Sequence, residues 1–340
     1  MKISKKGITF FSEDRYFLKR YGLMKATEVA TEYSKTHKTP FIYDLYQLAE
    51  VLGVKEVELF KLLNKTEKQY NFFEISKKNG GTRKIYAPTY TLRWVQKRIL
   101  IKILSNYSVS PYANAYIKGK NLSDNATPHI NKKYLLKIDI TDFFGSITFE
   151  QILSAVFNKN YYRTSVGVAL TNLCCYKGAL VQGAPTSPML SNLVMKHFDN
   201  VMGEWCKKQN ITYTRYCDDI TFSSNEPLYH AYSKAKAFLE SMGFELNLKK
   251  TRFVTNTSRQ TVTGLVVNQK VAVPSDYKRN LRKDIYYFLK FGTGDKTFIE
   301  SGLEYESYLN SLLGKTTYVL SIEPENEFFK KSKYKLLEKF

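Results

Sequence analysis

The chain has 340 residues, 43% of them hydrophobic, which is enough to bury the core of one large domain or of two to three subdomains. Its 52 Lys and Arg against 31 Asp and Glu give a net charge of +21, which favours a polyanionic partner such as nucleic acid and disfavours a hydrolase with a neutral surface, although solubility alone would also account for it. No run of about 18 apolar residues and no secretory signal occurs. We therefore expect a cytoplasmic protein without a membrane partner.

The cysteines and histidines show no pattern typical of a metal centre. Cys174, Cys175, Cys206 and Cys217 form no Cys-x-x-Cys pair, and the four histidines lie far apart along the chain. This spacing argues against a zinc site and indicates free, reduced thiols. The 26 Tyr and 22 Phe include rings that could stack on bases where they lie among basic residues, although most should belong to the core.

The first segment, residues 1–70, is expected to be a helical extension. Asp44 and Gln47 are typical of a capped helix start, and apolar residues then recur at helical spacing until a glycine interrupts them. A second short helix is predicted from Lys55 to Asn64. Such a pair could resemble a helix-turn-helix DNA reader, but packing is the commoner role of two short amphipathic helices.

A basic hairpin is predicted next. From Phe72 to Pro88, apolar and polar residues alternate around Asn79-Gly80-Gly81, a pattern typical of two antiparallel strands. The basic residues near its tip are Lys77, Lys78, Arg83 and Lys84. They could grip a triphosphate or a nucleic-acid backbone through charge-assisted hydrogen bonds, or they could be solvated turn residues. A helix is predicted from Thr91 to Tyr107.

The C-terminal segment, from about Pro274 onward, has a helical pattern and is basic. It ends in Lys330, Lys331, Lys333, Lys335 and Lys339. These lysines could follow a nucleic-acid backbone or form a solvated tail. No internal repeat, low-complexity tract or flexible linker occurs before the end of the chain, so we expect its parts to pack together.

Three aspartates lie where strands are predicted to end. Tyr134 to Ile140 is an apolar run that carries Asp139, and Tyr213 to Ser223 predicts two strands that meet at Asp218-Asp219. Taken alone, the acidic pair could be an exposed, solvated hairpin tip. Three carboxylates on neighbouring strands can instead hold two Mg²⁺ ions about 3.5–4 Å apart, which would stabilise an in-line phosphoryl displacement. That is the chemistry of a nucleotide polymerase.

The order of motifs around these aspartates resembles that of reverse transcriptases. Tyr216-Cys217-Asp218-Asp219 resembles the Y-x-D-D box of that family, and Lys137 to Phe144 resembles its preceding aspartate motif. Gln182 to Pro188 is similar to the Q-G-x-x-x-S-P loop, and Gly243 to Thr251 resembles the next motif. The resemblance implies an α+β, right-hand polymerase fold. Its fingers and its palm, an antiparallel sheet flanked by helices, would span residues 71–273, and a helical basic thumb would span residues 274–340.

The resemblance also implies roles for individual residues in an RNA-directed DNA polymerase. The residues that would hold the two Mg²⁺ ions are Asp139, Ile140, Asp218 and Asp219, and the three aspartates would be catalytic. The residues that would contact the incoming deoxynucleotide (dNTP) are Lys77, Arg83, Phe144, Gln182 and Lys250. Phe144 would reject the 2′-hydroxyl of a ribonucleotide, whereas Lys250 also has the simpler interpretation of a surface charge. Asp142 is not expected to be a metal ligand, and Cys217 is expected to be a small hydrophobe near the primer end.

Two short elements resemble those of bacterial retron reverse transcriptases. Asn125 to His129 resembles their N-A-x-x-H element, and Val262-Thr263-Gly264 matches their V-T-G element. The second could also be an ordinary strand, because Thr261 to Val267 and Lys270 to Val273 could form a hairpin around Asn268-Gln269. The resemblance implies that the residues involved in RNA recognition are Asn125, His129, Val262, Thr263 and Gly264.

A retron enzyme would bind its own structured noncoding RNA and prime from the 2′-hydroxyl of one guanosine. It would copy part of that RNA into a branched RNA–DNA product, msDNA, and act in bacterial antiphage defence beside a separate effector protein. Because the chain ends soon after the expected thumb, we expect no RNase H, integrase or endonuclease domain. The alternatives are another bacterial reverse transcriptase, such as a group II intron protein, and an RNA-binding scaffold that keeps the fold without catalysis.

Overall fold

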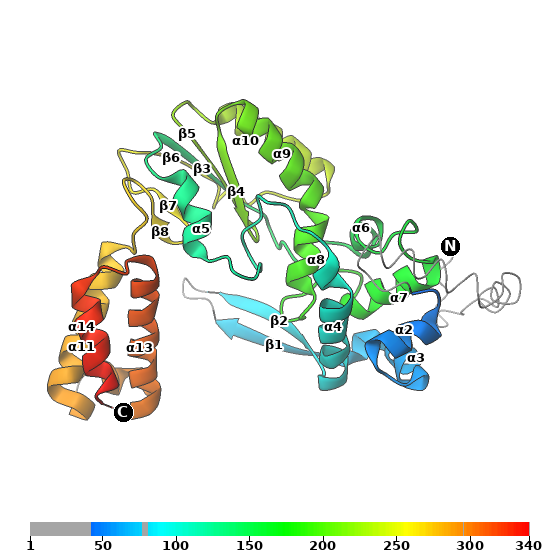
Figure 1. The fold of residues 1–340 in the computed structure, drawn as a ribbon, viewed down its shortest axis with the longest axis horizontal. Coiled ribbons are helices and arrows are strands. Elements are labelled where there is room, and N and C mark those ends of the chain that lie inside the picture. The colour runs from blue at the N-terminus through cyan, green and yellow to red at the C-terminus, as the bar shows by residue number, and fades with distance from the viewer. Residues whose placement is uncertain (1–41, 77–80, 295, 340) are drawn as a thin grey trace, which may run out of the picture.

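A four-stranded antiparallel sheet lies at the centre of the computed structural model, which describes residues 42–76, 81–294 and 296–339 (Figure 1). The strand order is β4-β5-β3-β6. The strands are β3 (Tyr134–Asp139), β4 (Thr212–Tyr216), β5 (Asp219–Ser224) and β6 (Arg252–Thr255). Side chains alternate between the two faces of a strand. Leu136 and Ile138 therefore lie in the core, whereas Lys137 and Asp139 share the opposite face.

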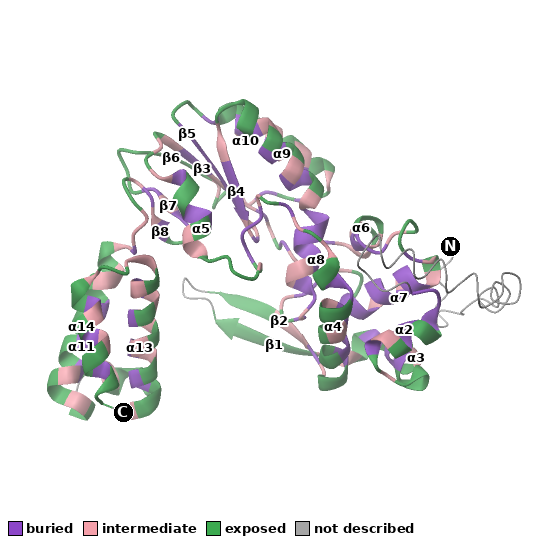
Figure 2. Ribbon diagram, viewed as in Figure 1, coloured by how far each residue is buried: buried purple, intermediate pink, exposed green. Residues whose placement is uncertain are grey.

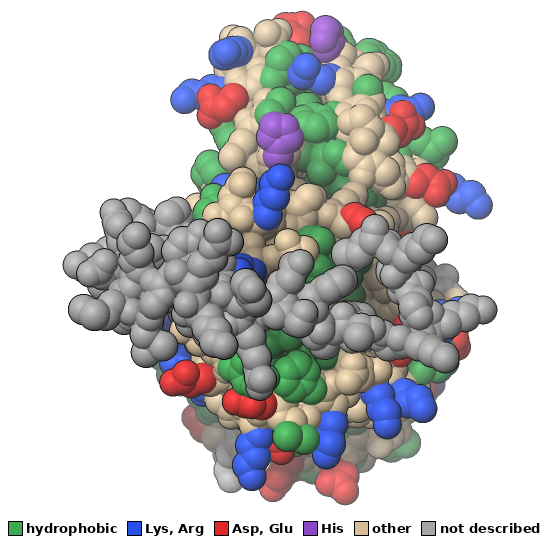
Figure 3. Space-filling view, turned by 90° about the vertical axis from the view of Figure 1, so that its right-hand side faces the viewer, with side chains coloured by type: hydrophobic (Ala, Val, Ile, Leu, Met, Phe, Trp, Pro, Cys, Tyr) green, Lys and Arg blue, Asp and Glu red, His purple; other side chains and the backbone are tan. Residues whose placement is uncertain are grey.

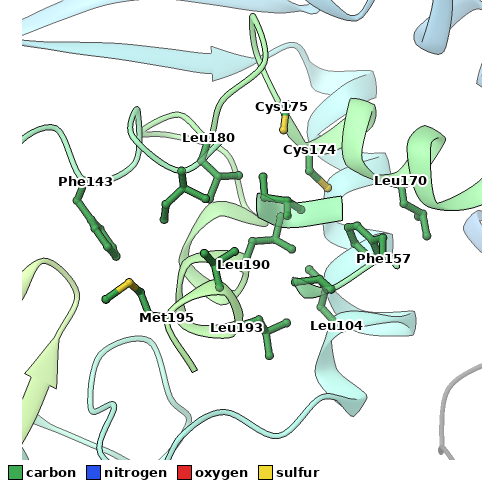
Figure 4. Close-up of a cluster of buried hydrophobic side chains, with 14 of the residues drawn as sticks. Leu104, Phe143, Phe157, Leu170, Cys174, Cys175, Leu180, Leu190, Leu193 and Met195 are labelled. Atoms are coloured by element: carbon green, nitrogen blue, oxygen red, sulfur yellow. The ribbon is translucent and has the colours of Figure 1, made fainter. Parts of the chain in front are cut away.

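Helices cover the apolar face of this sheet, and α9 packs against β4 while α10 packs against α9 (Figure 1). The helices of this region are α6 (Phe149–Ala155), α7 (Thr164–Cys174), α8 (Ser187–Val194), α9 (Lys196–Lys208) and α10 (Tyr229–Ser241). Figure 4 shows part of the resulting core, in which side chains from distant segments gather, among them Leu104, Phe157 and Leu190. All four cysteines are buried and free, as the sequence indicated.

Between residues 42 and 102, the described part of the chain forms a hairpin and three α-helices. Its elements are α2 (Leu45–Leu52), α3 (Glu56–Asn64), β1 (Tyr70–Ser76), β2 (Thr82–Pro88) and α4 (Tyr90–Lys102). The predicted cap is confirmed, because the Asp44 carboxylate accepts a hydrogen bond from the Gln47 N–H at 2.9 Å. Both α2 and α3 pack against α7, so they belong to the same core as the sheet.

The predicted hairpin is confirmed, with Tyr70 paired to Pro88 and Ser76 to Thr82. Its tip, residues 77–80, lies outside the described residues. The helix that follows is shorter than predicted. It ends at Lys102 rather than near Tyr107, because Ile103 is the C-terminal cap. A 3₁₀ turn follows over Leu104–Asn106. Both Ile103 and Leu104 are buried in the core.

The C-terminal segment is helical, as predicted, and forms a separate bundle beside the sheet (Figure 1). Its helices are α11 (Ser275–Phe291), α12 (Lys296–Ser301), α13 (Tyr305–Ile322) and α14 (Glu327–Leu337). A second hydrophobic cluster fills the bundle and reaches Ala126 of α5 (Leu122–Ala126) and Leu135 of β3. The second cluster thus joins the bundle to the sheet.

The segment from Thr261 to Val267, for which an ordinary strand was the alternative interpretation, is folded back on itself. It forms β7 (Thr261–Val262) and β8 (Leu265–Val266), joined by a turn in which Thr263 and Gly264 have φ values of 47° and 82°. In a continuous strand, Val262 and Leu265 would point to opposite faces. The turn buries both of them in the second hydrophobic cluster, which is why the single strand was wrong. The predicted contact across Asn268-Gln269 does form, between Val266 and Ala272.

Among the described residues, no helix is both long enough and apolar enough to cross a membrane.

Candidate active site

The turn between β4 and β5 places Asp218 at the tip of a tight hairpin. Tyr216 pairs with Asp219, so Cys217 and Asp218 form a two-residue loop. Cys217 has a φ of 61°, at a loop position where glycine is usual and any other residue is strained. The carbonyl oxygen of Cys217 accepts a hydrogen bond from Arg215 Nη1 at 2.9 Å. The surrounding structure therefore holds the strained turn in place.

Arg215 is the anchor of this turn, and it was missed in the sequence. Its guanidinium is fully buried, donates from Nε and Nη2 to the Asp199 carboxylate at 2.8 and 2.6 Å, and reaches Asn192 Oδ1 at 3.1 Å. Burial of an arginine is tolerated only when its donors are satisfied. The signal was present, because strand alternation puts Arg215 on the same buried face as Tyr213.

Asp139 lies directly opposite Asp219 in the sheet. Side chains at such a pair start from Cβ atoms about 4.5–5.5 Å apart. Burial raises the pKa of Asp218 and of Asp219 above the ordinary value, and the neighbouring carboxylates, including Asp139, raise both further. The backbone therefore brings the three predicted carboxylates into one small volume.

Two lysines balance these acids. Lys250 Nζ lies 3.0 and 3.1 Å from the two carboxylate oxygens of Asp139, and Lys137 Nζ lies 3.5 Å from Asp219 Oδ2. Lys250 was expected to contact the nucleotide, whereas Lys137 was missed. The signal for Lys137 was its position two residues before Asp139, which places both on the same face of β3.

The donor set suits a hard divalent cation, because it consists of carboxylate oxygens at a partly solvated edge. Across the described ranges, no three His, Cys, Asp or Glu side chains are already gathered as a metal site. Ile140 is buried and apolar, so its main-chain carbonyl is the only group that it could offer a metal.

The predicted nucleotide loop is joined to the basic hairpin. The Tyr86 N–H of β2 donates to the Gln182 carbonyl at 3.1 Å. Gly183 has a φ of 115°, and a Cβ there would lie 3.1 Å from the Tyr86 carbonyl oxygen, so only glycine fits without strain. Arg83 is exposed on β2, and Lys77 lies outside the described residues. The hairpin that carries Arg83 is thus fixed beside Gln182.

Two aromatic residues, Phe144 and Tyr116, have defined contacts. The half-buried Phe144 packs against Phe143, with ring centroids 5.5 Å apart. The Tyr116 hydroxyl donates to Cys217 Sγ at 3.3 Å, and Tyr116 itself has a φ of 61°. Nothing in the sequence around Tyr116 marked it as part of this site. Asp142 is exposed and has a φ of 41°, so the backbone turns sharply just beyond Asp139.

The residues expected to recognise RNA are largely turned into the protein. Asn125 and His129 are fully buried. Asn125 Oδ1 accepts from Asn114 Nδ2 at 3.1 Å, and the His129 ring lies 2.7 Å from Ser223 Oγ and 2.8 Å from Thr214 Oγ1. Any contribution of Asn125 and His129 to RNA recognition would therefore act through the shape of the protein.

The V-T-G element, Val262 to Gly264, lies beside the C-terminal helical bundle. Val262 is buried, Thr263 is half-buried and Gly264 is exposed, so the turn between β7 and β8 is the part of this element that reaches the surface.

The chain matches known proteins along most of its length. Residues 75–276 match the family model described as reverse transcriptase (RNA-dependent DNA polymerase). The chain is 31% identical to the retron Ec86 reverse transcriptase of Escherichia coli over 296 residues, covering 84% of this chain and 91% of that protein. It is also 31% identical to the Escherichia coli retron Ec83 reverse transcriptase over 271 residues, covering 75% and 83% respectively.

A solved structure of telomerase from Candida albicans, in complex with a fragment of telomeric RNA, aligns with 79% of this chain and 60% of that chain, with a TM-score of 0.45 and 11% identity. The chain therefore spans less than two thirds of that telomerase. Together, the matched domain and the two retron relatives place this chain in the reverse transcriptase family, RNA-directed DNA polymerases that use divalent metal ions, and within it among the retron reverse transcriptases.

Proposed function

We propose that this enzyme binds one cognate structured noncoding RNA, primes from the 2′-hydroxyl of a guanosine and copies part of the RNA into msDNA. The observation that carries the proposal is the pairing of Asp139 with Asp219 beside the strained turn at Asp218. It occurs in a chain that aligns with nine tenths of a retron reverse transcriptase. We further propose that the enzyme works in the bacterial cytoplasm, in antiphage defence with a separate effector protein.

The three aspartates and the Ile140 carbonyl would hold two Mg²⁺ ions, which when bound stabilise charge on the attacking and leaving oxygens of an in-line displacement. Lys250 and Lys137 would release Asp139 and Asp219 on metal binding. Lys250 is 62% exposed, so it could then swing to the triphosphate of a dNTP. The rigid hairpin would keep Asp218 aimed at the reacting atoms, because Arg215 fixes the Cys217 carbonyl.

The incoming dNTP would lie between the basic hairpin and the loop at Gln182. Arg83 and Lys77 would bind its phosphates, because charge-assisted hydrogen bonds to phosphate are strong. Phe144 would lie under the sugar and exclude a 2′-hydroxyl. We propose that residues 1–70, of which 1–41 lie outside the described residues, form an N-terminal helical extension. Residues 71–273 would form the fingers and palm, and residues 274–340 the thumb.

Expression of the gene with its native upstream DNA tests the proposal. We expect a short DNA that survives RNase and shortens by a few nucleotides of attached RNA after treatment with a 2′,5′-debranching enzyme. Asp218→Ala should abolish this DNA, whereas Glu226→Gln, an exposed control, should not. If the purified enzyme extends primers on RNA but the cells contain no branched DNA, the retron mechanism is wrong. If Asp218→Ala leaves the DNA and the phenotype intact, the protein is a scaffold instead.

A further inference from the structure

The segment around α4 is basic and free of acids. No Asp or Glu occurs between Glu74 and Asp124, whereas the chain average of 31 acids in 340 residues would place about four there. The Lys and Arg residues of this stretch are Lys77, Lys78, Arg83, Lys84, Arg93, Lys97, Arg98, Lys102, Lys118 and Lys120. A stretch that carries positive charges and no negative ones gives a surface with a positive electrostatic potential. On the face shown in Figure 3, by contrast, acidic and basic side chains are mixed.

Helix α4 presents part of this charge together with two aromatic rings. Leu92, Val95 and Ile99 bury one side of the helix in the core. The other side, which we call the α4 outer face, consists of Tyr90, Arg93, Trp94 and Lys97, all exposed. Exposed turns of α4 are visible in Figure 2. Residues four apart on a helix are neighbours, so two rings and two cations form adjacent rows.

The rings of the α4 outer face leave apolar surface in contact with water, most of all at Tyr90. Tyr90 is 86% exposed and Trp94 is 37% exposed. Exposed aromatic groups among basic residues are typical of surfaces that stack on unpaired bases.

Trp94 is held in place by its neighbours. Arg98 lies over the Trp94 ring at 5.3 Å from the ring centroid, and Arg98 Nε donates to the Leu52 carbonyl at the end of α2, at 3.1 Å. A Cβ on Gly53 would lie 2.9 Å from the Arg98 guanidinium, so the close approach depends on glycine at that position. The ring is therefore pre-organised, which lowers the entropy lost when a ligand stacks on it.

We propose that the α4 outer face binds a single-stranded segment of RNA outside the polymerase site. Tyr90 and Trp94 stack on its bases, while Arg93 and Lys97 contact its phosphates. The face lies on the side of α4 opposite to the core, and the strand proposed to bind there is a different segment from the template. RNA is the occupant because the proposed function, on which this inference rests, requires a structured RNA with unpaired segments.

Fluorescence tests this surface directly, because the chain has two tryptophans. In the Trp205→Phe variant, Trp94 is the only tryptophan, and titration with a 12-nucleotide oligouridylate should quench its fluorescence.

In the Trp205→Phe background, Arg93→Ala/Lys97→Ala should weaken oligouridylate binding by about tenfold or more. Loss of two phosphate contacts should also reduce the slope of log K against log salt by about 1.4, at about 0.7 for each contact with a single strand. Tyr90→Ala should weaken binding at least about fivefold.

The control is Lys207→Ala/Lys208→Ala, which removes the same charge from exposed positions of α9. It should leave oligouridylate binding within about twofold. Unchanged Trp94 fluorescence, an equal loss of affinity in the control, or tighter binding of the matching DNA oligonucleotide would each overturn the proposal. Extension of a short annealed primer should be the same in every variant. If the Trp205→Phe enzyme extends primers but makes no branched DNA, the proposed function fails while the binding measurement still decides this inference.

Discussion

Asp218 and Asp219 carry a cost to stability when no metal is bound. Burial and the neighbouring carboxylates raise the pKa of both groups, so the folded state holds their protons more tightly than the unfolded state does. The stability that protonation supplies is present at low pH and is lost as the pH rises through the folded-state pKa. The ionised pair therefore destabilises the metal-free protein at neutral pH.

Asp218→Asn should accordingly stabilise the protein in the presence of a chelator. We expect a rise in Tm of up to about 3 °C at pH 7, since 1 kcal/mol shifts Tm by about 2–4 °C in domains of 150–250 residues. The difference should shrink as the pH is lowered, because protonation removes the charge of the wild-type carboxyl and the pKa of Asp218 is raised. Thermal unfolding of both proteins and of the exposed control Glu226→Gln would measure it. A lower Tm for Asp218→Asn at pH 7 would show that burial does not penalise this carboxylate.

Phe144 should decide which sugar the enzyme accepts. Phe144→Val removes a ring that packs against Phe143 and opens space where the resemblance places the 2′-hydroxyl. We expect the preference for deoxynucleotides over ribonucleotides to fall at least about tenfold, the factor for about 1.4 kcal/mol of lost discrimination. Single-nucleotide incorporation with dNTP and NTP would measure the ratio. Tyr86→Phe keeps the ring in the hairpin and should leave that ratio unchanged.

At the scale of elements, one buried ion pair joins α9 to the hairpin that carries Asp218. Asp199 and Arg215 are both fully buried, at 2.6 Å between Oδ2 and Nη2. Asp199→Ala leaves the guanidinium without its partner, so we expect a loss of about 3–5 kcal/mol in the free energy of unfolding. Asp276→Ala removes an exposed pair with Arg259 and should cost less than about 1 kcal/mol. Urea denaturation would compare them, and equal losses would contradict the anchoring role of Arg215.

His129 bridges β4 and β5 through Thr214 and Ser223. Burial lowers the pKa of His129 to about 3, below the ordinary 6.5, so stability is present above the unfolded value and is lost as the pH falls from about 6.5. His129→Gln should be less stable by about 1–3 kcal/mol at pH 7, because buried hydroxyls lose a partner. The difference in unfolding free energy between the wild type and His129→Gln, measured by urea denaturation, should be smaller at pH 4.5 than at pH 7. A gap that widens on acidification would mean that His129 is charged in the folded protein.

The catalytic elements could be predicted from the sequence because local signals agree there. An apolar run marked β3, and two aromatic or β-branched runs marked β4 and β5. The turn at Thr263-Gly264 escaped prediction, because the run of β-branched residues favoured one strand while burial of Val262 and Leu265 together depended on the C-terminal bundle. The contact of Lys137 with Asp219 depends on β3 and β5 being neighbours, and that of Arg215 with Asp199 depends on α9 packing against β4. Sequence spacing specifies neither arrangement.

At the scale of the whole molecule, two hydrophobic clusters organise the chain. The first runs from α2 to Leu246 and supports the face that carries Asp139, Asp218 and Asp219. The second fills the C-terminal bundle and reaches back to Leu135 of β3, the same strand that ends at Asp139. Strand β3 thus contributes side chains to both clusters. It therefore connects the C-terminal bundle to the position of Asp139.

Primer extension on RNA tests the central claim, that the three aspartates form the centre of an RNA-directed DNA polymerase. Purified protein would be given an RNA template, an annealed primer, dNTPs and Mg²⁺. We predict extension by the wild type and a rate at least about 10³-fold lower for Asp218→Asn, a loss of about 4 kcal/mol, with primer–template binding unchanged. Asp142→Asn, on the exposed neighbour of the site, should retain activity. Absence of extension by the wild type, or equal rates for the two Asp→Asn variants, would contradict the account.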